Sequence, residues 1–289
     1  MSQSAPLPVR HVRVTAVRRV TPRMVRITFG GPALADFVLT GPDQQVKLFF
    51  PKPGRSTPVL PEPDGADGAD GDVMRWYAAY QAIPEHERPW MRSYTIRAHD
   101  PGRRTVDIDF LLHGDAADEG PATRWARRAR PGDTLGMFGP SAAFAGPVAA
   151  GTAGWTLLAG DQCALPALGT IAEALPAGHR AVAYVEVPDP AEEQPLPSAG
   201  ELTVHWLHGR GLLLEAVRTA DLPCGQGCAW LAGEAGVVRA LRRHLVGERG
   251  LARGSVDFTG YWRHRLSQDD APTPEDLAEA RERLAGLDG

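Results

Sequence analysis

The feature that most constrains the fold is a change in hydrophobic period near residue 151. Residues 10–50 alternate apolar and polar side chains, as in "HVRVTAVRRV", "MVRITF" and "QQVKLFF". This period of two is typical of half-buried strands. After residue 151, "GWTLLAG" is a continuous apolar run, which indicates a strand buried on both faces, and "ALPALGTIAEALPAG" then has helical spacing and a closing Gly. The sequence therefore predicts a β domain followed by an α/β domain.

The first domain is predicted to be a six-stranded antiparallel Greek-key barrel. Strands resume with "RSYTIRA" and "RTVDIDFLLHG", a short helix follows over 121–129, and "DTLGMFGP" provides the last strand. Residues 51–74 are rich in Pro, Gly and Asp, and predict an exposed loop. The barrel domain is expected over 1–140 and the linker over 141–154.

The second domain, over 155–289, is predicted to be a parallel-sheet nucleotide-binding domain. The strand-and-helix unit recurs through strands 179–187 and 201–209, helix 211–219, strand 228–234, helix 236–248 and strand 255–262. The tail "TPEDLAEARERLAGL" predicts a capped amphipathic helix.

Charge and hydropathy exclude several classes of function. The formal net charge of −4 argues against a general nucleic-acid binder. No apolar run is long enough to cross a bilayer, so membrane insertion is not expected. The N-terminal residues lack an apolar signal core, which makes the cytoplasm the expected location. Cys163, Cys224 and Cys228 lack a second pair at metal-ligand spacing, which favours buried or loop thiols.

A barrel joined to a parallel sheet suggests two ligands. In open α/β sheets the ligand binds at the carboxyl ends of the strands, and Gly160 and Asp161 form the turn there before a helix. Gly120 and Thr123 start the short helix of the barrel, where free N–H groups suit a pyrophosphate, although Thr123 is equally read as an ordinary cap. GxGxxG and P-loop motifs are absent, as is any nucleophile–base pair. A bound cofactor is therefore expected to supply the reactivity.

Several short motifs, in order and spacing, carry a resemblance to a known family. They are "VKLFF", "MRSYTIR", "VDIDFLLHG", "GPATRWA", "PGDTLGMFGP", "AGDQCALPAL", "AGE" and "GYWR". With these motifs the chain resembles the siderophore-interacting protein family, which are ferric-siderophore reductases on the ferredoxin-reductase-like scaffold.

The resemblance implies FAD in the barrel and NADPH or NADH on the α/β domain. Arg92 would face the FAD pyrophosphate, Tyr94 would pack on the flavin or its ribityl chain, and Thr95 would lie by the reactive N5. Tyr94 and Thr95 are thus the residues placed nearest the chemistry. The implied cofactor contacts are Arg92, Ser93, Tyr94, Thr95, Asp109, Leu111, His113, Gly120, Ala122, Thr123, Asp161, Cys163, Ala164 and Pro166.

Strand alternation limits how these residues act together. It puts Arg92 and Tyr94 on one face and Thr95 on the other, so Thr95 needs a local twist or must use its amide. The family usually has Thr where this chain has Cys163. Trp262 or Tyr261 is expected to cover the flavin's other face or to pack in the core.

The implied substrate is a ferric siderophore, with no metal ligand from the protein. Reduction of Fe(III) weakens its bonds to hard oxygen donors and releases Fe(II). Because such complexes are commonly anionic, Lys47, Arg124, Arg263 and Arg265 are predicted to dock them, unless they are ordinary solvated side chains. Arg239, Arg242 and Arg243 form a second basic cluster, which could neutralise the 2′-phosphate of NADPH. A ferredoxin is the alternative electron donor. Rival readings are a flavin reductase with another acceptor and a non-catalytic, flavin-bound siderophore-binding protein.

Overall fold

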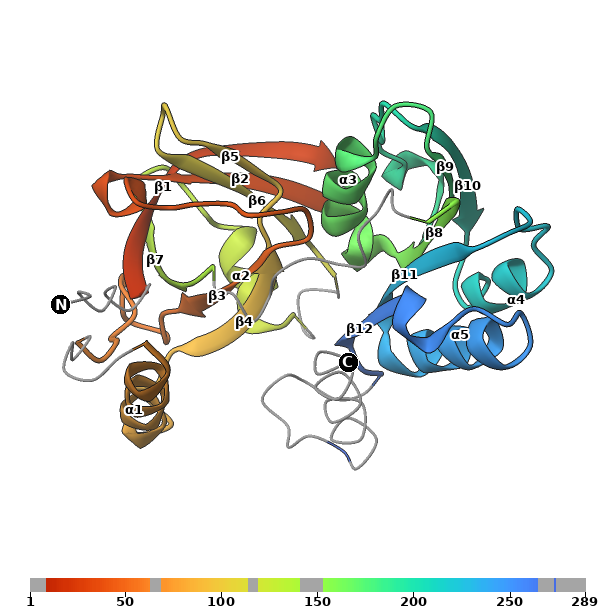
Figure 1. Cartoon of the computed structure of the whole chain (residues 1–289). Coiled ribbons are helices and arrows are strands. Elements are labelled where there is room, and N and C mark those ends of the chain that lie inside the picture. The colour runs from red at the N-terminus through yellow and green to blue at the C-terminus, as the bar shows by residue number, and fades with distance from the viewer. Residues whose placement is uncertain (1–8, 63–68, 114–118, 141–152, 265–272, 274–289) are drawn as a thin grey trace, which may run out of the picture. The chain divides into compact units, whose positions relative to one another are not determined.

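The computed structural model describes residues 9–62, 69–113, 119–140 and 153–264, and Thr273. The chain forms two compact units (Figure 1). The first comprises Met1–Gly146 with Gly169–Ile171 and Ala191–Pro195, and the second comprises the remainder. The predicted linker and C-terminal helix fall almost entirely outside the described residues, so the predicted domain boundaries at 140 and 155 stay predictions. None of the described helices is both long and apolar enough to span a bilayer.

The described part of the first unit contains a seven-stranded antiparallel, barrel-like sheet. Its order is β4-β3-β7-β1-β2-β6-β5. The strands are β1 (Val9–Thr21), β2 (Met24–Gly30), β3 (Gln45–Phe50), β4 (Trp90–Thr95), β5 (Ala98–Asp100), β6 (Thr105–Leu111) and β7 (Thr134–Phe138). The predicted barrel is confirmed, with one strand more than expected. The addition is β5, whose three residues are too few to show a period.

Alternation of side chains builds the core of this unit. Val46, Leu48 and Phe50 of β3 point into the main core, where they meet apolar side chains from β1, β2, β6 and β7. The intervening Phe49 is also fully buried, but it packs in a separate cluster with Trp76 and Tyr80. Both faces of β3 are therefore buried.

The second cluster explains a helix that the sequence pattern missed. α1 (Ala69–Ala82) includes residues predicted to belong to the loop 51–74. The first residues of α1 are rich in Gly and Asp, which are typical of loops, so the sequence pattern does not indicate a helix. Tertiary packing stabilises the helix instead, because Phe49 lies 5.5 Å from Trp76 and 5.3 Å from Tyr80, measured between ring centroids. The indole of Trp76 also donates to the carbonyl of Pro61.

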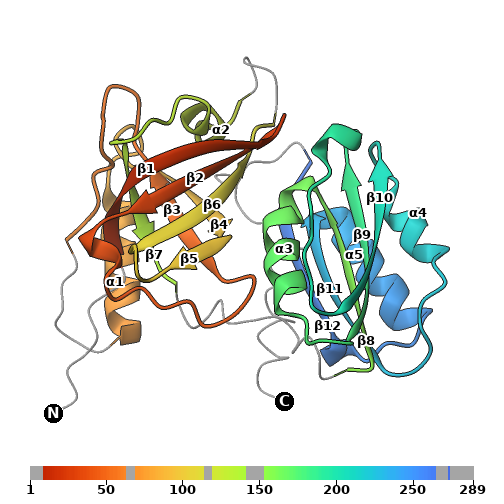
Figure 2. The ribbon, with the colours of Figure 1, turned by 90° about the horizontal axis from the view of Figure 1, so that it is seen from above.

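The described part of the second unit contains a five-stranded parallel sheet, as predicted (Figure 2). Its order is β10-β9-β8-β11-β12. The strands are β8 (Trp155–Asp161), β9 (Arg180–Val187), β10 (Glu201–His208), β11 (Gly227–Glu234) and β12 (Val256–Trp262). The apolar run over β8 is buried from Trp155 to Gly160, as its continuous pattern indicated.

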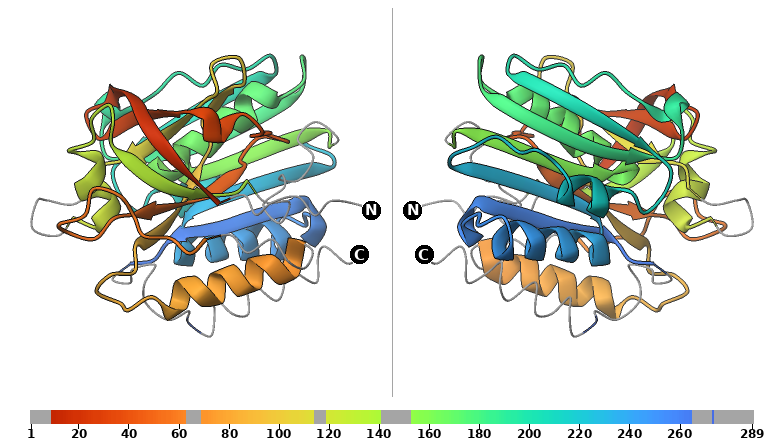
Figure 3. Two further views of the ribbon diagram at one scale, coloured as in Figure 1. Left: turned by 90° about the vertical axis from the view of Figure 1, so that its left-hand side faces the viewer. Right: turned by 90° about the vertical axis from the view of Figure 1, so that its right-hand side faces the viewer.

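Helices cover both faces of this sheet. α3 (Leu165–Ala174) lies on one face, and α4 (Leu213–Arg218) and α5 (Ala235–Gly247) lie on the other, with α5 along β12 (Figures 2 and 3). The predicted helices at 211–219 and 236–248 are present with slightly different ends. In the first unit, α2 (Pro121–Ala126) is shorter than the predicted helix 121–129.

Candidate functional site

Strand β4 presents its residues to two faces, as alternation predicted. In the ladder with β3, Ser93 pairs with Lys47 and Tyr94 pairs with Val46. The Lys47 Nζ donates to Ser93 Oγ over 2.6 Å, so these two side chains share one face. Tyr94 belongs to the other face and packs against the core. Thr95 follows on the Ser93 face and is 7% exposed.

Tyr94 is held by aromatic neighbours. Its ring centroid lies 4.4 Å from that of Phe110 and 6.2 Å from that of Phe50. Burial raises the pKa of Tyr94, so its hydroxyl stays protonated. The phenol can therefore offer a ring edge and a hydrogen bond, but not a charge. The neighbouring Arg92 guanidinium donates to the carbonyl of Met91 at 2.8 Å and stays half-buried.

The start of α2 is open to an anion. Gly120 is its N-cap and Pro121 its first residue, and no described side chain caps this end. The amides of Ala122 and Thr123 are in the first turn, where an α-helix has no internal acceptors. A Cβ built on Gly120 would meet nothing within 4 Å. These observations fit a phosphate group at this position.

Two predicted contacts have protein partners. The carboxylate of Asp109 is buried and forms a bidentate ion pair with Arg26, at 2.6 and 2.7 Å. The hydroxyl of Thr123 makes a long contact of 3.5 Å with the carbonyl of Leu111. A direct flavin contact for Asp109 stays a prediction, and its carboxylate already neutralises Arg26.

His113 follows β6 and keeps an exposed edge. Partial burial lowers the pKa of His113, and Arg127 lowers it further by charge repulsion. Its imidazole is therefore mostly neutral at physiological pH, when it can accept as well as donate a hydrogen bond.

In the second unit, Asp161 ends β8 at the carboxyl edge of the sheet. Its Oδ1 accepts from the amide and the thiol of Cys163, at 3.0 and 2.7 Å. Its Oδ2 accepts from the amide of Glu234 at 3.0 Å and from the indole of Trp262 at 2.7 Å. Asp161 therefore joins the carboxyl ends of β8, β11 and β12.

Cys163, Ala164 and Pro166 follow in the turn and in the first residues of α3. Burial, and then the charge of Asp161, raise the pKa of the Cys163 thiol well above its usual value. The thiol is consequently a hydrogen-bond donor rather than a reactive thiolate. Ala164 is fully buried against Gly160, where a Cβ would come within 2.6 Å of the Ala164 Cβ. The small residues of this motif thus allow close packing of the turn.

Sequence reasoning missed two further carboxylates at this edge. Glu186, near the end of β9, accepts from the amides of Leu212 and Leu213 at the start of α4, at 2.7 and 2.9 Å. Glu234 ends β11 and accepts from the amide of Val237 in the first turn of α5, at 2.9 Å. The position of an acidic residue directly before a helix was the available signal for Glu234. For Glu186 the contact spans 26 residues and carries no local signal.

The predicted basic residues belong to both units: Lys47 and Arg124 to the first, and Arg263 to the second. Lys47 lies on β3, and burial lowers its pKa. Arg124 lies on α2, where it is exposed and donates to the carbonyl of Glu119. Arg263 is half-buried after β12, and Arg265 lies outside the described residues. In the second basic group, the Arg242 guanidinium stacks 4.4 Å from the ring centroid of Phe258, which indicates a packing role.

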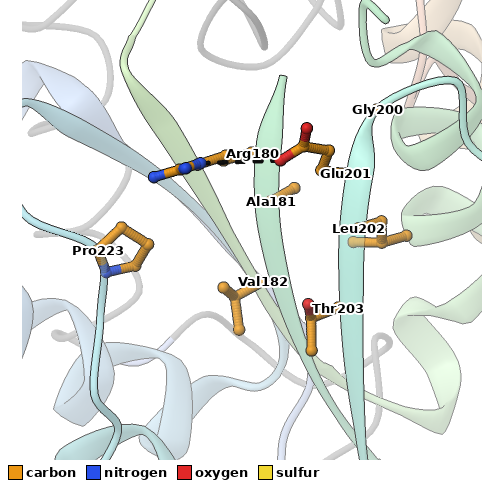
Figure 4. Close-up of a pocket in the computed structure, with 8 residues that line it drawn as sticks. All are labelled: Arg180, Ala181, Val182, Gly200, Glu201, Leu202, Thr203 and Pro223. Carbon is orange, nitrogen blue, oxygen red and sulfur yellow. Dashed lines mark ion pairs between the residues drawn. The ribbon is translucent and has the colours of Figure 1, made fainter. Parts of the chain in front are cut away.

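The described surface includes one hollow at β9 and β10 and another beside α2. A pocket of about 480 Å³ lies at the amino ends of β9 and β10, where Arg180 pairs with Glu201 (Figure 4). Ligands of parallel sheets bind at the opposite, carboxyl edge, so we assign this pocket no role. A pocket of about 290 Å³ lies beside α2, lined by aromatic residues and by the cations Lys52, Arg55, Arg124 and Arg128.

Two features together define a class of fold. They are an antiparallel barrel with an uncapped helix start, and a parallel sheet that follows it and has a turn at Asp161. The chain has the ferredoxin-reductase-like fold. The family models narrow this class. Residues 13–144 match the siderophore-interacting FAD-binding domain, and residues 153–265 match the siderophore-interacting protein domain. The chain belongs to the siderophore-interacting protein family, as its motifs predicted.

Relatives along the whole chain agree with this assignment. The crystal structure of a siderophore utilization protein from T. fusca is 35% identical, with a TM-score of 0.76 over 92% of this chain and 97% of that chain. The NADPH-dependent ferric-chelate reductase of Escherichia coli is 30% identical over 83% of this chain and 87% of its own length. The ferric vibriobactin reductase of Vibrio cholerae is 29% identical over 86% of this chain and 88% of its own length.

Proposed function

We propose that this protein is an FAD-dependent NAD(P)H oxidoreductase that reduces ferric siderophores and so releases Fe(II). One observation carries the proposal: a barrel of the siderophore-interacting FAD-binding type places an uncapped helix start beside the strand that bears Arg92 and Tyr94. Relatives named as ferric-chelate and ferric vibriobactin reductases support the choice of reaction.

In the first unit, the uncapped start of α2 and the strand that bears Arg92 and Tyr94 support FAD binding. The amides of Ala122 and Thr123, with the Arg92 guanidinium, would hold the pyrophosphate, since helix N-termini and Arg both favour anions. Tyr94 would pack along the flavin or its ribityl chain. Ser93, Thr95, Leu111 and His113 would contact the flavin or its phosphates from neighbouring positions.

The turn from Gly160 to Pro166 is the proposed nicotinamide side. When bound, FAD supplies the step between a two-electron donor, NAD(P)H, and a one-electron acceptor, Fe(III). The chain's own part is to orient both partners and to keep reactive side chains away from the transfer. The protonated thiol of Cys163 and the protonated phenol of Tyr94 suit this role, because neither carries a charge.

Lys47 is the proposed docking cation for an anionic ferric complex. Its Nζ is held by Ser93 on the same face as Thr95. Arg124, Arg263 and Arg265 would add further cations. Loss of one charge from the iron weakens its bonds to hard oxygen donors, and the metal then leaves the siderophore. We further propose that the reaction takes place in the cytoplasm, where NAD(P)H is regenerated, as a step of iron uptake.

Anaerobic double-mixing kinetics test the proposal. The FAD-loaded protein is first mixed with NADH or NADPH, and then with a ferric siderophore in the presence of a ferrous chelator. We expect bleaching of the flavin absorbance, followed by its return together with Fe(II) capture. Reoxidation by other acceptors but not by ferric siderophores would favour the flavin-reductase alternative. Absence of flavin reduction by both nucleotides and by a reduced ferredoxin would favour a siderophore-binding protein without redox activity.

A further inference from the structure

The carboxylate of Asp161 is saturated by its own chain. A carboxylate offers about four lone-pair positions, and four hydrogen bonds reach Asp161. All four donors are neutral: two amides, one thiol and one indole. Such a group has no acceptor position left for a cofactor or substrate.

The surrounding backbone is shaped to bring the carboxylate to these donors. Gly233 has a φ of 142°, and a Cβ there would lie 2.6 Å from Asp161 Oδ2. Gly260 allows β12 to approach Ala235, since a Cβ at Gly260 would lie 2.8 Å from the Ala235 Cβ. Any side chain at Gly233 would displace the carboxylate.

One of the four donors differs from the others because its side chain is partly exposed to solvent. Trp262 is 44% exposed, yet its Nε1 is fixed at 2.7 Å from Asp161. An indole has one hydrogen-bond donor and no acceptor, so this bond limits rotation of the ring about its attachment. The adjacent Tyr261 is turned the other way, with its ring 6.5 Å from that of Trp230 in an edge-on arrangement. Of the two aromatic candidates at this strand end, Tyr261 packs in the unit and Trp262 presents an anchored, exposed face.

We propose that Asp161 is a positioning residue that fixes the plane of the Trp262 indole, and that this indole is the stacking face for the nicotinamide ring of NAD(P)H. The inference rests on the proposed function for its ligand. One observation and two general properties of aromatic rings support the ligand class. The indole lies at the carboxyl end of β12, where parallel sheets bind nucleotides. A planar aromatic face suits a planar ring, and the oxidised nicotinamide is a cation that an indole attracts.

The anchoring part is tested by the indole N–H resonances of the FAD-loaded protein with ¹⁵N-labelled tryptophan. The chain has seven Trp residues, and Trp262→Phe identifies the relevant signal by its disappearance. We expect Asp161→Asn to move this signal upfield and to broaden it, because one carboxylate oxygen becomes an NH2 group and the oxygen that remains is a neutral, weaker acceptor. An unchanged signal in Asp161→Asn would overturn the inference.

The stacking part is tested by adding NADP⁺ or NAD⁺, which bind without reducing the flavin. We expect the Trp262 signal to shift in the wild-type protein, with little effect on the signal of Trp206, a half-buried indole on β10. A Trp262 signal that does not respond to saturating nucleotide would contradict the stacking role.

Kinetics separate positioning from a merely structural role. Trp262→Phe keeps a ring but lacks the N–H, and we expect it to raise KM for NADPH about three- to tenfold with kcat less affected. Asp161→Asn should have a similar effect. In the Trp262→Phe background, Asp161→Asn should add less than about twofold, because the anchored group is already missing. Multiplied effects in the double variant would show that Asp161 acts through its other three bonds, and would refute the proposal.

These readouts also separate this inference from the proposed function. If neither nucleotide reduces the wild-type flavin and neither binds, the proposed donor and the stacking role both fail. The indole signal of Asp161→Asn still decides the anchoring role. Trp206→Phe serves as the control, with KM for NADPH expected to be unchanged.

Discussion

The two units differ in whether side chains cap the N-termini of their helices. In the first unit α2 begins at Gly120, and no described side chain caps it. In the second unit, Glu186 accepts from the amides at the start of α4, and Glu234 caps the start of α5. Asp161 caps the short turn that precedes α3. The same orphan amides are thus left open in one unit and are satisfied internally in the other.

This difference is consistent with FAD as a tightly bound cofactor and NAD(P)H as a substrate that binds and leaves. Amides without an acceptor at a helix start lower the stability of the protein unless an anion stays bound there. Such a start is therefore suited to an FAD that stays bound. Starts already capped by carboxylates are stable alone, and their negative charge opposes a second anion. We therefore expect tight FAD binding in the first unit and weak, reversible NAD(P)H binding in the second.

The largest expected effect comes from the different partners that stabilise a buried carboxylate in each unit. Asp109 neutralises a cation, Arg26, whereas Asp161 has only neutral donors. Asp109→Ala removes the bidentate carboxylate partner of the partly buried Arg26, and should lower the free energy of unfolding by about 3–5 kcal/mol. Chemical denaturation of the apoprotein measures this.

The matched control is Glu87→Ala, which removes an exposed ion pair with Arg55 and should cost about 0.5 kcal/mol or less. A loss for Asp109→Ala as small as that of the control, together with lost FAD, would identify Asp109 as a cofactor contact instead.

The next largest effect is expected from a substitution that gives the uncapped start of α2 a side-chain cap. Gly120→Asp adds a capping carboxylate at a position where a Cβ has room. The apoprotein should keep or gain stability, while FAD affinity should fall about 100-fold through charge repulsion at the pyrophosphate. Fluorescence titration with FAD measures the affinity.

Gly120→Asn is the control, since it caps without a charge. An Asp variant that binds FAD as tightly as the Asn variant would remove the pyrophosphate from this helix start.

These expectations show what the sequence could and could not predict. Strand alternation predicted the separate faces of Tyr94 and Thr95, because period two is a local property. Short motifs predicted the flavin-type barrel and the turn at Asp161. The partner of Asp109 could not be predicted, since the Arg26–Asp109 pair spans 83 residues. The same holds for Asp161, whose bond to Trp262 spans 101 residues. Its cofactor contact stays a prediction, and the bond is the basis of the proposed anchoring role.

A smaller effect belongs to Lys47, the cation on the face of the first unit that also bears Ser93. Lys47→Ala should raise KM for an anionic ferric chelate about tenfold without changing FAD affinity. Because burial lowers the pKa of Lys47 from 10.5, its charge is lost at a lower pH than for an exposed lysine. KM for the chelate should therefore rise as pH increases through this lowered pKa in the wild type.

Steady-state assays from pH 7 to 10, with Lys52→Ala as the control, test this prediction. A KM rise with pH that persists in Lys47→Ala would assign the titration to another group.

The smallest effect is expected from a substitution that removes the charge at a capped helix start of the second unit. Glu234→Gln keeps an acceptor for the amide of Val237 but loses the negative charge. KM for NADPH should fall about two- to threefold. Glu201→Gln, at the amino edge of the same sheet, should leave it unchanged. A raised KM in Glu234→Gln would mean that the carboxylate helps to bind the nucleotide.

The contrast between the two units is tested most directly by calorimetric titration of one preparation with both nucleotides. FAD is added to the apoprotein, and NADP⁺ is then added to the FAD-loaded protein. We expect one FAD site whose Kd is at least about 100-fold lower than that for NADP⁺, a difference of about 2.7 kcal/mol in binding free energy. NADP⁺ binding as tight as FAD binding, or FAD binding too weak to measure, would contradict the account.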